Sequence, residues 1–360
     1  MSVPLLAAIT RTGSADGVAV VADLLHGALV HGWGPDVRTV TMFDGPAAAP
    51  RLADKVRFTL RLGRALVRTR PAWVVANHLG LLRALSGMPG IVRPPYAVFL
   101  HGIEAWRPFG PSTLRLVSCA RVRLANSHYT ARRVQATNPG VGPIEVCHLA
   151  LPASRAPREP DPGTAIPDIG EAAVLAVGRM AASERYKGHD ALLAAWPQVI
   201  ARVPSARLVF AGGGDDVERI RKAAANPVLR GTVHVAGFVP DAELELLYRR
   251  SAVFALPSTD EGFGLVYLEA MARGLPCVAL RDSAAAEIVA DGVTGVLAAS
   301  REPDALAAAL IPLLADRERR VAMGEAARAR VTHEFSRARF EARVTEALSR
   351  AFAATHEPAA

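Results

Sequence analysis

The sequence predicts an α/β protein made of two Rossmann-like halves, and three observations lead to this fold class. Both halves alternate short apolar runs with amphipathic stretches, which is the pattern of open parallel sheets covered by helices. Residues 152–163 lie between the halves, are rich in proline and lack periodicity, which is a linker composition. Glycine-rich turns follow several of the apolar runs, at the strand ends where such sheets bind ligands.

The elements of the first half are predicted from the spacing of apolar residues and from the length of each apolar stretch. Short apolar runs bounded by turn residues favour strands, whereas longer stretches with apolar residues at helical spacing favour helices. The predicted strands are residues 4–9, 73–76, 96–100 and 123–125, and the predicted helices are about 18–31, 51–69, 111–119 and 127–135.

The same reasoning assigns the second half and its boundaries. Its predicted strands are 173–177, 206–211, 233–236, 253–256, 277–280 and 295–297, with helices that include 189–202, 241–250, 264–273 and 303–315. We therefore expect a first domain over 1–153, a linker over 154–170 and a second domain over 171–335. Residues 336–360 hold an amphipathic final helix and a tail, which we expect to pack back on the first domain.

The composition narrows the class of protein. Of the 360 residues 51% are hydrophobic and 21% charged, so the chain can bury a large core and global disorder is excluded. The longest apolar run, 305–315, is too short to span a bilayer, and the first residues read as a strand because they have no basic segment of a signal peptide. Three widely spaced cysteines favour a reducing cytoplasm, and Cys147-His148 is expected to pack rather than to bind metal.

The net charge of +8 is unevenly distributed. Residues 1–153 hold 17 Lys and Arg against 7 Asp and Glu, a net of +10, whereas the remainder is close to neutral. This asymmetry in charge predicts that the first half binds an anionic surface or substrate.

A basic amphipathic segment, residues 51–70, contributes much of this charge. It carries Arg51, Lys55, Arg57, Arg61, Arg64, Arg68 and Arg70 against one acid, Asp54. On a helix Leu52, Val56, Leu60 and Val67 share one face. The helix either lies on anionic lipid headgroups, or buries that apolar stripe against the sheet and leaves its arginines in solvent. Nucleic acid is not favoured, because no exposed aromatic residues or binding motif accompany the charge.

The segment from Glu261 to Glu269 predicts an anion site. A glycine turn at Gly262 and Gly264 follows an apolar run and opens a helix, so unpaired N–H groups and the positive helix end point at one place. A carboxylate on each side could hold hydroxyl groups of a sugar or ribose. Phosphate flanked by such contacts is the chemistry of a nucleotide-sugar.

Upstream, Arg179 and Lys187 could together neutralise a diphosphate, because arginine offers a fork of donors and lysine a compact charge. The alternative is two solvated loop cations. Gly213 lies in a glycine turn after another strand, which either lets the backbone approach a ligand closely or is a plain tight turn. Phe238 and Val239 follow a further strand and either cradle a nucleobase through backbone groups or form a plain turn.

These motifs, in this order, resemble glycosyltransferase family 4, a group of retaining enzymes with the GT-B fold. The resemblance covers roughly residues 171–300, and a looser one covers parts of the first half. Its residues are Gly178-Arg179, Lys187-Gly188, Gly212-Gly213-Gly214, Gly237-Phe238-Val239, Glu261-Gly262-Phe263-Gly264, Glu269-Ala270, Gly274-Leu275-Pro276 and Glu287-Ile288, with Phe99-Leu100-His101-Gly102 and Ala125-Asn126-Ser127 in the first half.

The resemblance implies two Rossmann-like domains facing across a cleft, and a role for each site residue. Glu269 would bind the ribose and Glu261 the transferred sugar, while Arg179 and Lys187 would hold the diphosphate. The N–H groups of Gly264, Leu265 and Val266 would add to that grip. His101 would lie near the reacting sugar, where local evidence alone suggests a capping or core histidine. Gly17, at the end of the loop 12–17, would face the donor phosphate or the acceptor.

The predicted function is retaining transfer of a hexose, of mannose or glucose type, from a GDP- or UDP-sugar. The acceptor would be a hydroxyl of a glycan, a lipid-linked or a small molecule, in the cytoplasm or on the inner face of a membrane. No Asp-x-Asp occurs, so the cations are expected to replace a metal. The alternatives are an epimerase or phosphorylase of the same fold, or a silent sugar-binding subunit.

Overall fold

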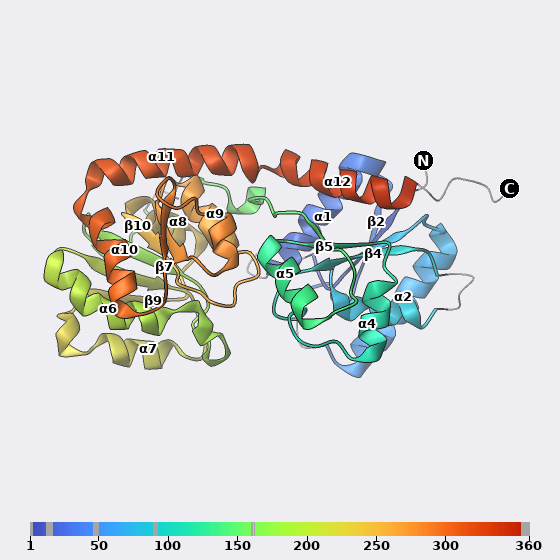
Figure 1. The fold of residues 1–360 in the computed structure, drawn as a ribbon, viewed down its shortest axis with the longest axis horizontal. Coiled ribbons are helices and arrows are strands. Elements are labelled where there is room, and N and C mark those ends of the chain that lie inside the picture. The colour runs from blue at the N-terminus through green and yellow to red at the C-terminus, as the bar shows by residue number, and fades with distance from the viewer. Residues whose placement is uncertain are drawn as a thin grey trace. The chain divides into compact units, whose positions relative to one another are not determined.

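A computed structural model describes residues 3–11, 17–45, 50–88, 93–159, 161 and 163–353. The chain divides into two compact units, each with its own sheet (Figure 1). The first unit comprises Met1–Ser154 and Phe335–Ala360, and the second comprises Arg155–Glu334. Residues 155–170, predicted as a linker, are counted with the second unit.

The first unit is built on a six-stranded sheet in which all registered pairs are parallel. The strand order is β2-β1-β3-β4-β5-β6. The strands are β1 (Leu5–Ala8), β2 (Arg38–Thr41), β3 (Val74–Ala76), β4 (Tyr96–Leu100), β5 (Val122–Ala125) and β6 (Glu145–Val146). Strands β1, β3, β4 and β5 are buried along their whole length, as expected for a sheet covered on both faces.

Helices cover this sheet. They are α1 (Gly17–Trp33), α2 (Leu52–Thr69), α3 (Leu82–Ser86), α4 (Pro111–Ser118), α5 (His128–Thr137) and, from the end of the chain, α12 (Arg337–Ala353). Helix α12 packs on α1. Phe352 of α12 stacks on Trp73 with 4.4 Å between ring centroids, so the last helix is anchored to the core of the first unit.

The second unit repeats the architecture. Its sheet has the order β12-β11-β10-β7-β8-β9 and parallel pairing. The strands are β7 (Ala173–Val177), β8 (Arg207–Ala211), β9 (Val233–Gly237), β10 (Val253–Ala255), β11 (Cys277–Leu280) and β12 (Gly295–Ala298). The helices are α6 (His189–Arg202), α7 (Val217–Ala224), α8 (Asp241–Arg250), α9 (Leu265–Ala272), α10 (Pro303–Ala315) and α11 (Arg317–Glu334).

The predicted α/β class is confirmed, and every predicted strand and helix is present within a few residues of its predicted ends. Two strands and three α-helices of the described residues had no predicted bounds: β2, β6, α3, α7 and α11. Strand β2 is an edge strand with an exposed arginine, and β6 has only two residues, so neither produces an apolar run. Helices α3 and α7 are only five and eight residues long, and α11 carries many charged residues, which weakens its periodic signal.

The strand orders place a topological switch point in each unit. In the second unit, β8 and β9 lie to one side of β7, and β10 to the other. In the first unit, β2 lies on one side of β1 and β3 on the other, so the switch point is between β1 and β3. Ligands of open parallel sheets bind beyond the carboxyl ends of the strands at such points. None of the described helices is both long enough and apolar enough to cross a membrane.

Candidate functional site

The switch point of the second unit gathers three of the predicted donor residues. Arg179 follows β7, and Glu261 lies in the loop after β10. Lys187 ends a short 3-10 helix, Ala182–Lys187, that also belongs to the loop after β7. The two loops are joined by a hydrogen bond from the Thr259 N–H to the Tyr186 carbonyl, 3.1 Å long.

Lys187 lies between two carboxylates. Its Nζ is 3.4 Å from Oε2 of Glu261 and 3.6 Å from Oε2 of Glu184. The other oxygen of Glu184 forms an ion pair with Arg179. The Lys187 side chain is largely buried, whereas that of Arg179 is 76% exposed and therefore available to a ligand. We call Arg179, Glu184, Lys187 and Glu261 the charge cluster.

Glycine makes the charge cluster possible. Gly188 follows Lys187 with φ +88°, and a Cβ there would lie 2.6 Å from the Pro257 carbonyl oxygen. Only glycine allows this close approach of the two loops. Glu184 itself leaves the helical conformation, with φ −119° and ψ 26°, and its carboxylate pairs with both cations.

The start of α9 has the predicted form. Gly264 is its N-cap residue with φ +99° and, as a glycine, offers no side chain that could cap the helix. A Cβ at Gly264 would lie 2.7 Å from the Tyr267 ring and 3.5 Å from Cγ of Glu261. The first-turn N–H groups, which include those of Leu265 and Val266, have no partner one turn earlier in a helix. This helix end adjoins the charge cluster through Glu261 and can attract an anion.

Glu269 has a different environment from Glu261. Its side chain is 3% exposed, Oε1 accepts from Nη1 of Arg155 at 2.7 Å, and Oε2 accepts from the Tyr248 hydroxyl at 3.2 Å. Burial raises the pKa of Glu269, and Arg155 and Tyr248 oppose the rise. The two predicted carboxylates therefore do not form an acid–base couple in the described chain, since each is held by its own partners.

The glycine turn after β8 approaches the end of β7. A Cβ at Gly212 would lie 2.0 Å from the Gly178 carbonyl oxygen, and one at Gly214 would lie 2.1 Å from that of Met180. A Cβ at Gly213 would lie 3.3 Å from Cβ of Phe238, so the structure brings these two predicted residues together. Phe238 is 80% exposed and is followed by the partly buried Val239. An exposed aromatic ring beside a glycine turn is suited to stacking on a base.

In the first unit, His101 follows β4 in a polar cluster at the carboxyl ends of three strands. Its Nε2 donates to the carbonyl of Asn77, which follows β3. Its N–H donates to Oε1 of Glu104 at 2.7 Å, and its carbonyl accepts from Asn126, which follows β5, at 2.6 Å. The bond from Nε2 leaves Nδ1 as the acceptor of the ring. His78 lies 6.0 Å from His101 by ring centroids.

Gly17 is the first residue of α1 and is exposed. The rest of its predicted loop, Thr12 to Asp16, lies outside the described residues. Asn77 connects this helix start to His101, because its Nδ2 donates to the Val18 carbonyl at 3.3 Å. Asn77 and Asn126 were not predicted as site residues.

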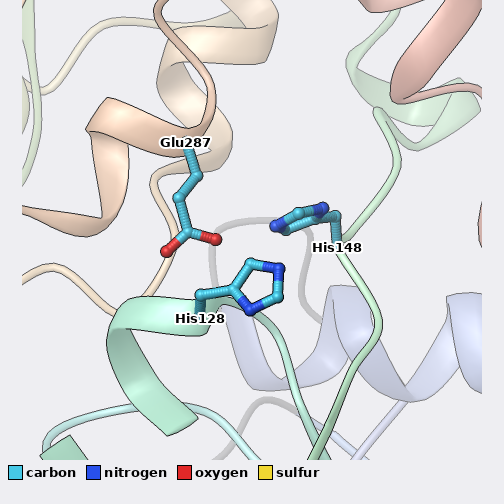
Figure 2. Close-up of side chains that lie close together, drawn as sticks. All are labelled: His128, His148 and Glu287. Atoms are coloured by element: carbon cyan, nitrogen blue, oxygen red, sulfur yellow. The ribbon is translucent and has the colours of Figure 1, made fainter. Parts of the chain in front are cut away.

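His128 and His148 form a further imidazole pair in the first unit, edge to face with 5.5 Å between ring centroids (Figure 2). Glu287, which is also drawn there, is a residue of the second unit. A protein zinc site takes three or four ligands, so the pair alone does not make one. Cys147 is buried, and burial raises the pKa of its thiol to about 12, which fits the predicted packing role.

In the second unit, Glu184, Arg155 and Tyr248 are site residues that sequence reasoning missed. Glu184 stands three residues before Lys187, and this spacing is a signal that could have found it. Arg155 is 114 residues from Glu269, and no local pattern connects the two.

Comparison with known proteins gives a consistent result. Residues 167–330 match the family model described as "Glycosyl transferases group 1". The glycogen synthase of Mycobacterium tuberculosis is 31% identical over 309 residues, which are 78% of this chain and 72% of that protein. A GDP-mannose-dependent alpha-(1-6)-phosphatidylinositol monomannoside mannosyltransferase of the same organism is 38% identical over 156 residues, 41% of this chain. That alignment spans only 40% of the mannosyltransferase.

Two solved structures support the fold. The sucrose-phosphate synthase of Thermosynechococcus elongatus superposes with a TM-score of 0.78 at 20% identity, over 98% of this chain and 100% of that one. HepE of Anabaena, crystallised with UDP and glucose, superposes with a TM-score of 0.72 at 20% identity, over 97% and 100%. At this identity the likeness concerns the fold alone, and it confirms the predicted GT-B class.

Proposed function

The chain belongs to the group 1 glycosyl transferase family, glycosyltransferase family 4, and on this premise we propose that it transfers a hexose from a nucleotide-diphosphate sugar to an acceptor hydroxyl with retention of configuration. One observation carries the proposal. Arg179 and Lys187, which follow β7, are joined through Glu184, and Lys187 also pairs with Glu261, which follows β10, at the switch point where such sheets bind ligands.

The second unit would bind the donor. Arg179 and Lys187 would hold the diphosphate, together with the N–H groups at the start of α9. Glu261 would accept hydrogen bonds from the transferred sugar, and Glu269 from the ribose. Phe238, Val239 and Gly213 would hold the base. The first unit would bind the acceptor beside His101, with Gly17 facing the donor phosphate or the acceptor.

The chemistry would rest on charge stabilisation. As the bond between the anomeric carbon and the diphosphate breaks, negative charge develops on the leaving oxygens, next to Arg179, Lys187 and the positive end of α9. The acceptor hydroxyl then attacks from the face that the diphosphate leaves, and the leaving phosphate takes its proton. No covalent nucleophile is required in this scheme.

The names of similar proteins guide the choice of sugar and base. One relative is named for GDP-mannose, and one structural neighbour was crystallised with UDP and glucose. These names favour a mannose- or glucose-type hexose on GDP or UDP. The cation pair would take the place of a metal, so activity is expected to survive a chelator. Activity abolished by chelation and restored by magnesium or manganese would refute this part.

The acceptor is proposed to be a hydroxyl of a glycan, lipid-linked or small molecule in the cytoplasm. The relative at 38% identity is named for a phosphatidylinositol mannoside acceptor, which supports the lipid-linked case. A lipid-linked acceptor would bring the enzyme to the inner face of a membrane.

Two measurements test the proposal together. UDP or GDP should raise the unfolding temperature of the wild type by mass action, and Arg179→Ala should lose most of this shift. Glu261→Ala should keep the nucleotide shift but lose transfer from a labelled donor, because Glu261 is assigned to the sugar. Arg319→Ala, on the exposed surface of α11, serves as a control. Full transfer by both Arg179→Ala and Glu261→Ala would refute the assignment.

A further inference from the structure

Helix α2 buries a face other than the one that its sequence suggests. Phe58, Leu62 and Leu66 pack into the core of the first unit. Leu52, Val56, Leu60 and Val67 share one face of the helix, but they are 78%, 50%, 69% and 60% exposed. The alternative in which this apolar stripe is buried against the sheet is therefore wrong. The helix has two apolar faces. The second face is contacted by the Met88 side chain at Gly63 and is exposed at these four side chains.

A row of arginines lies beside the exposed apolar stripe. With about 100° per residue, Leu52, Val56, Leu60 and Val67 fall within about 80° of one another, and the next positions around the helix belong to arginines. These are Arg57, Arg61, Arg64 and Arg68, all exposed. Arg57 and Arg61 pair with Asp54 and Asp44 on the surface, where such pairs are weak and easily exchanged.

The clustering on α2 is unusual for this chain. Nine large apolar side chains are exposed among the described residues, and four of them are on this one helix. Scattered exposed apolar residues are normal on a protein surface, whereas a contiguous stripe marks a contact surface.

We propose that α2 lies flat on an anionic membrane. Leu52, Val56, Leu60 and Val67 enter the boundary between headgroups and acyl chains, and the arginine row binds lipid phosphates at its edge. Charge complementarity selects this occupant: residues 1–153 carry a net charge of +10, and arginine forms paired hydrogen bonds with phosphate. The inference goes beyond the proposed function, because binding to lipid does not require sugar transfer.

The test is co-sedimentation of the full chain with vesicles of phosphatidylcholine alone or of phosphatidylcholine with phosphatidylglycerol. We expect binding to the anionic vesicles, loss of that binding at high salt, and little binding to the neutral ones. Replacing Arg57, Arg61, Arg64 and Arg68 by Gln should weaken anionic-vesicle binding more than about tenfold, since each cation near such a surface contributes to the attraction. Leu52→Ser with Leu60→Ser should weaken binding while the salt dependence remains.

Helix α11 offers a matched control. Arg317→Gln, Arg319→Gln and Val321→Ser change exposed residues of the same kinds and should leave vesicle binding unchanged. A circular dichroism spectrum and an unfolding temperature like those of the wild type report that each variant is folded. Equal binding to neutral and anionic vesicles would overturn the proposal. So would unchanged binding of the α2 variants, or self-association through α2 without any vesicle binding.

Discussion

Arg155 and Glu269 form an ion pair, with 2.7 Å between Nη1 and Oε1, that joins the first residue of the second unit to the middle of α9. The Glu269 side chain is 3% exposed and that of Arg155 22%. A carboxylate so far removed from water depends on its partners, because an unpaired buried charge is costly. Glu269, the residue proposed to bind the ribose, is therefore stabilised in its buried position by an ion pair within the second unit.

Removing Arg155 should destabilise the protein, and more so at high pH. Arg155→Leu leaves the buried Glu269 without its cation, and we expect a loss of about 3 kcal/mol in the free energy of unfolding. The folded-state pKa of Glu269 is already raised by burial and should rise further. Stability is then lost as pH increases above the unfolded pKa, because the folded state resists ionisation. Urea unfolding at pH 5 and pH 8 measures both effects.

The control for this pair is Glu269→Gln in the Arg155→Leu background. This variant carries no buried charge and should recover most of the stability at pH 8. A double variant as unstable as Arg155→Leu, or equal losses at the two pH values, would show that Arg155 acts through packing rather than charge.

Glu184→Gln should strengthen nucleoside diphosphate binding. Glu184 forms ion pairs with both Arg179 and Lys187, the cations proposed to hold the diphosphate. Its negative charge therefore competes with an incoming diphosphate, and two unit charges about 4 Å apart repel each other by about 1 kcal/mol at the dielectric constant of water. We expect the dissociation constant of UDP or GDP, measured by calorimetry, to fall about fivefold.

Glu218→Gln is the matched control, because Glu218 is an exposed acid that pairs with Arg221 on α7. It should bind nucleotide like the wild type. Weaker binding by Glu184→Gln would instead mean that Glu184 mainly positions the two cations.

Gly264→Ala should cost more stability than Gly292→Ala. Both glycines have positive φ, +99° and +75°, so alanine is strained at either position. At Gly264 the new Cβ would also lie 2.7 Å from the Tyr267 ring, whereas nothing lies within 4 Å at Gly292. Tyr267 cannot easily move, because its hydroxyl donates to the Leu256 carbonyl. We expect an extra loss of about 2 kcal/mol at Gly264 in urea unfolding, and equal losses would contradict the predicted crowding.

His189 should make the stability depend on pH. It is buried, and its Nε2 has no hydrogen-bond partner among the described residues. Burial is the main cause that lowers its pKa to about 4, and the charge of Lys187 adds to it. The unfolded state therefore binds a proton that the folded state does not, as pH falls from about 6.5 to about 4. This contribution is fully present above pH 6.5 and declines by about 3 kcal/mol toward pH 4.

His189→Phe keeps a ring against Phe210, on which the histidine now packs edge to face at 5.2 Å. The variant has no proton to bind, so its unfolding free energy should fall less between pH 7 and pH 4 than that of the wild type. An identical decline in both proteins would place the pH dependence in other groups.

The sequence by itself determined the class and the local parts of this protein. Apolar runs predicted the central strands, because strands buried on both faces need continuous apolar residues. Glycines at Gly188 and Gly264 marked turns that no other residue allows, since both have positive φ and a neighbour within 3 Å of a Cβ. Arg179, Lys187 and Glu261 were predicted from their place after strands, and strand order brings those places together.

Only the tertiary structure decided which partners these residues have. Local patterns carry no information on contacts between distant segments, so the pairing of Glu269 with Arg155 and Tyr248 could not be predicted. The same holds for α2, where two apolar faces compete for one sheet. Packing buries Phe58, Leu62 and Leu66 and leaves Leu52 and its stripe exposed, because an aromatic and two leucines one turn apart fit the core of the first unit.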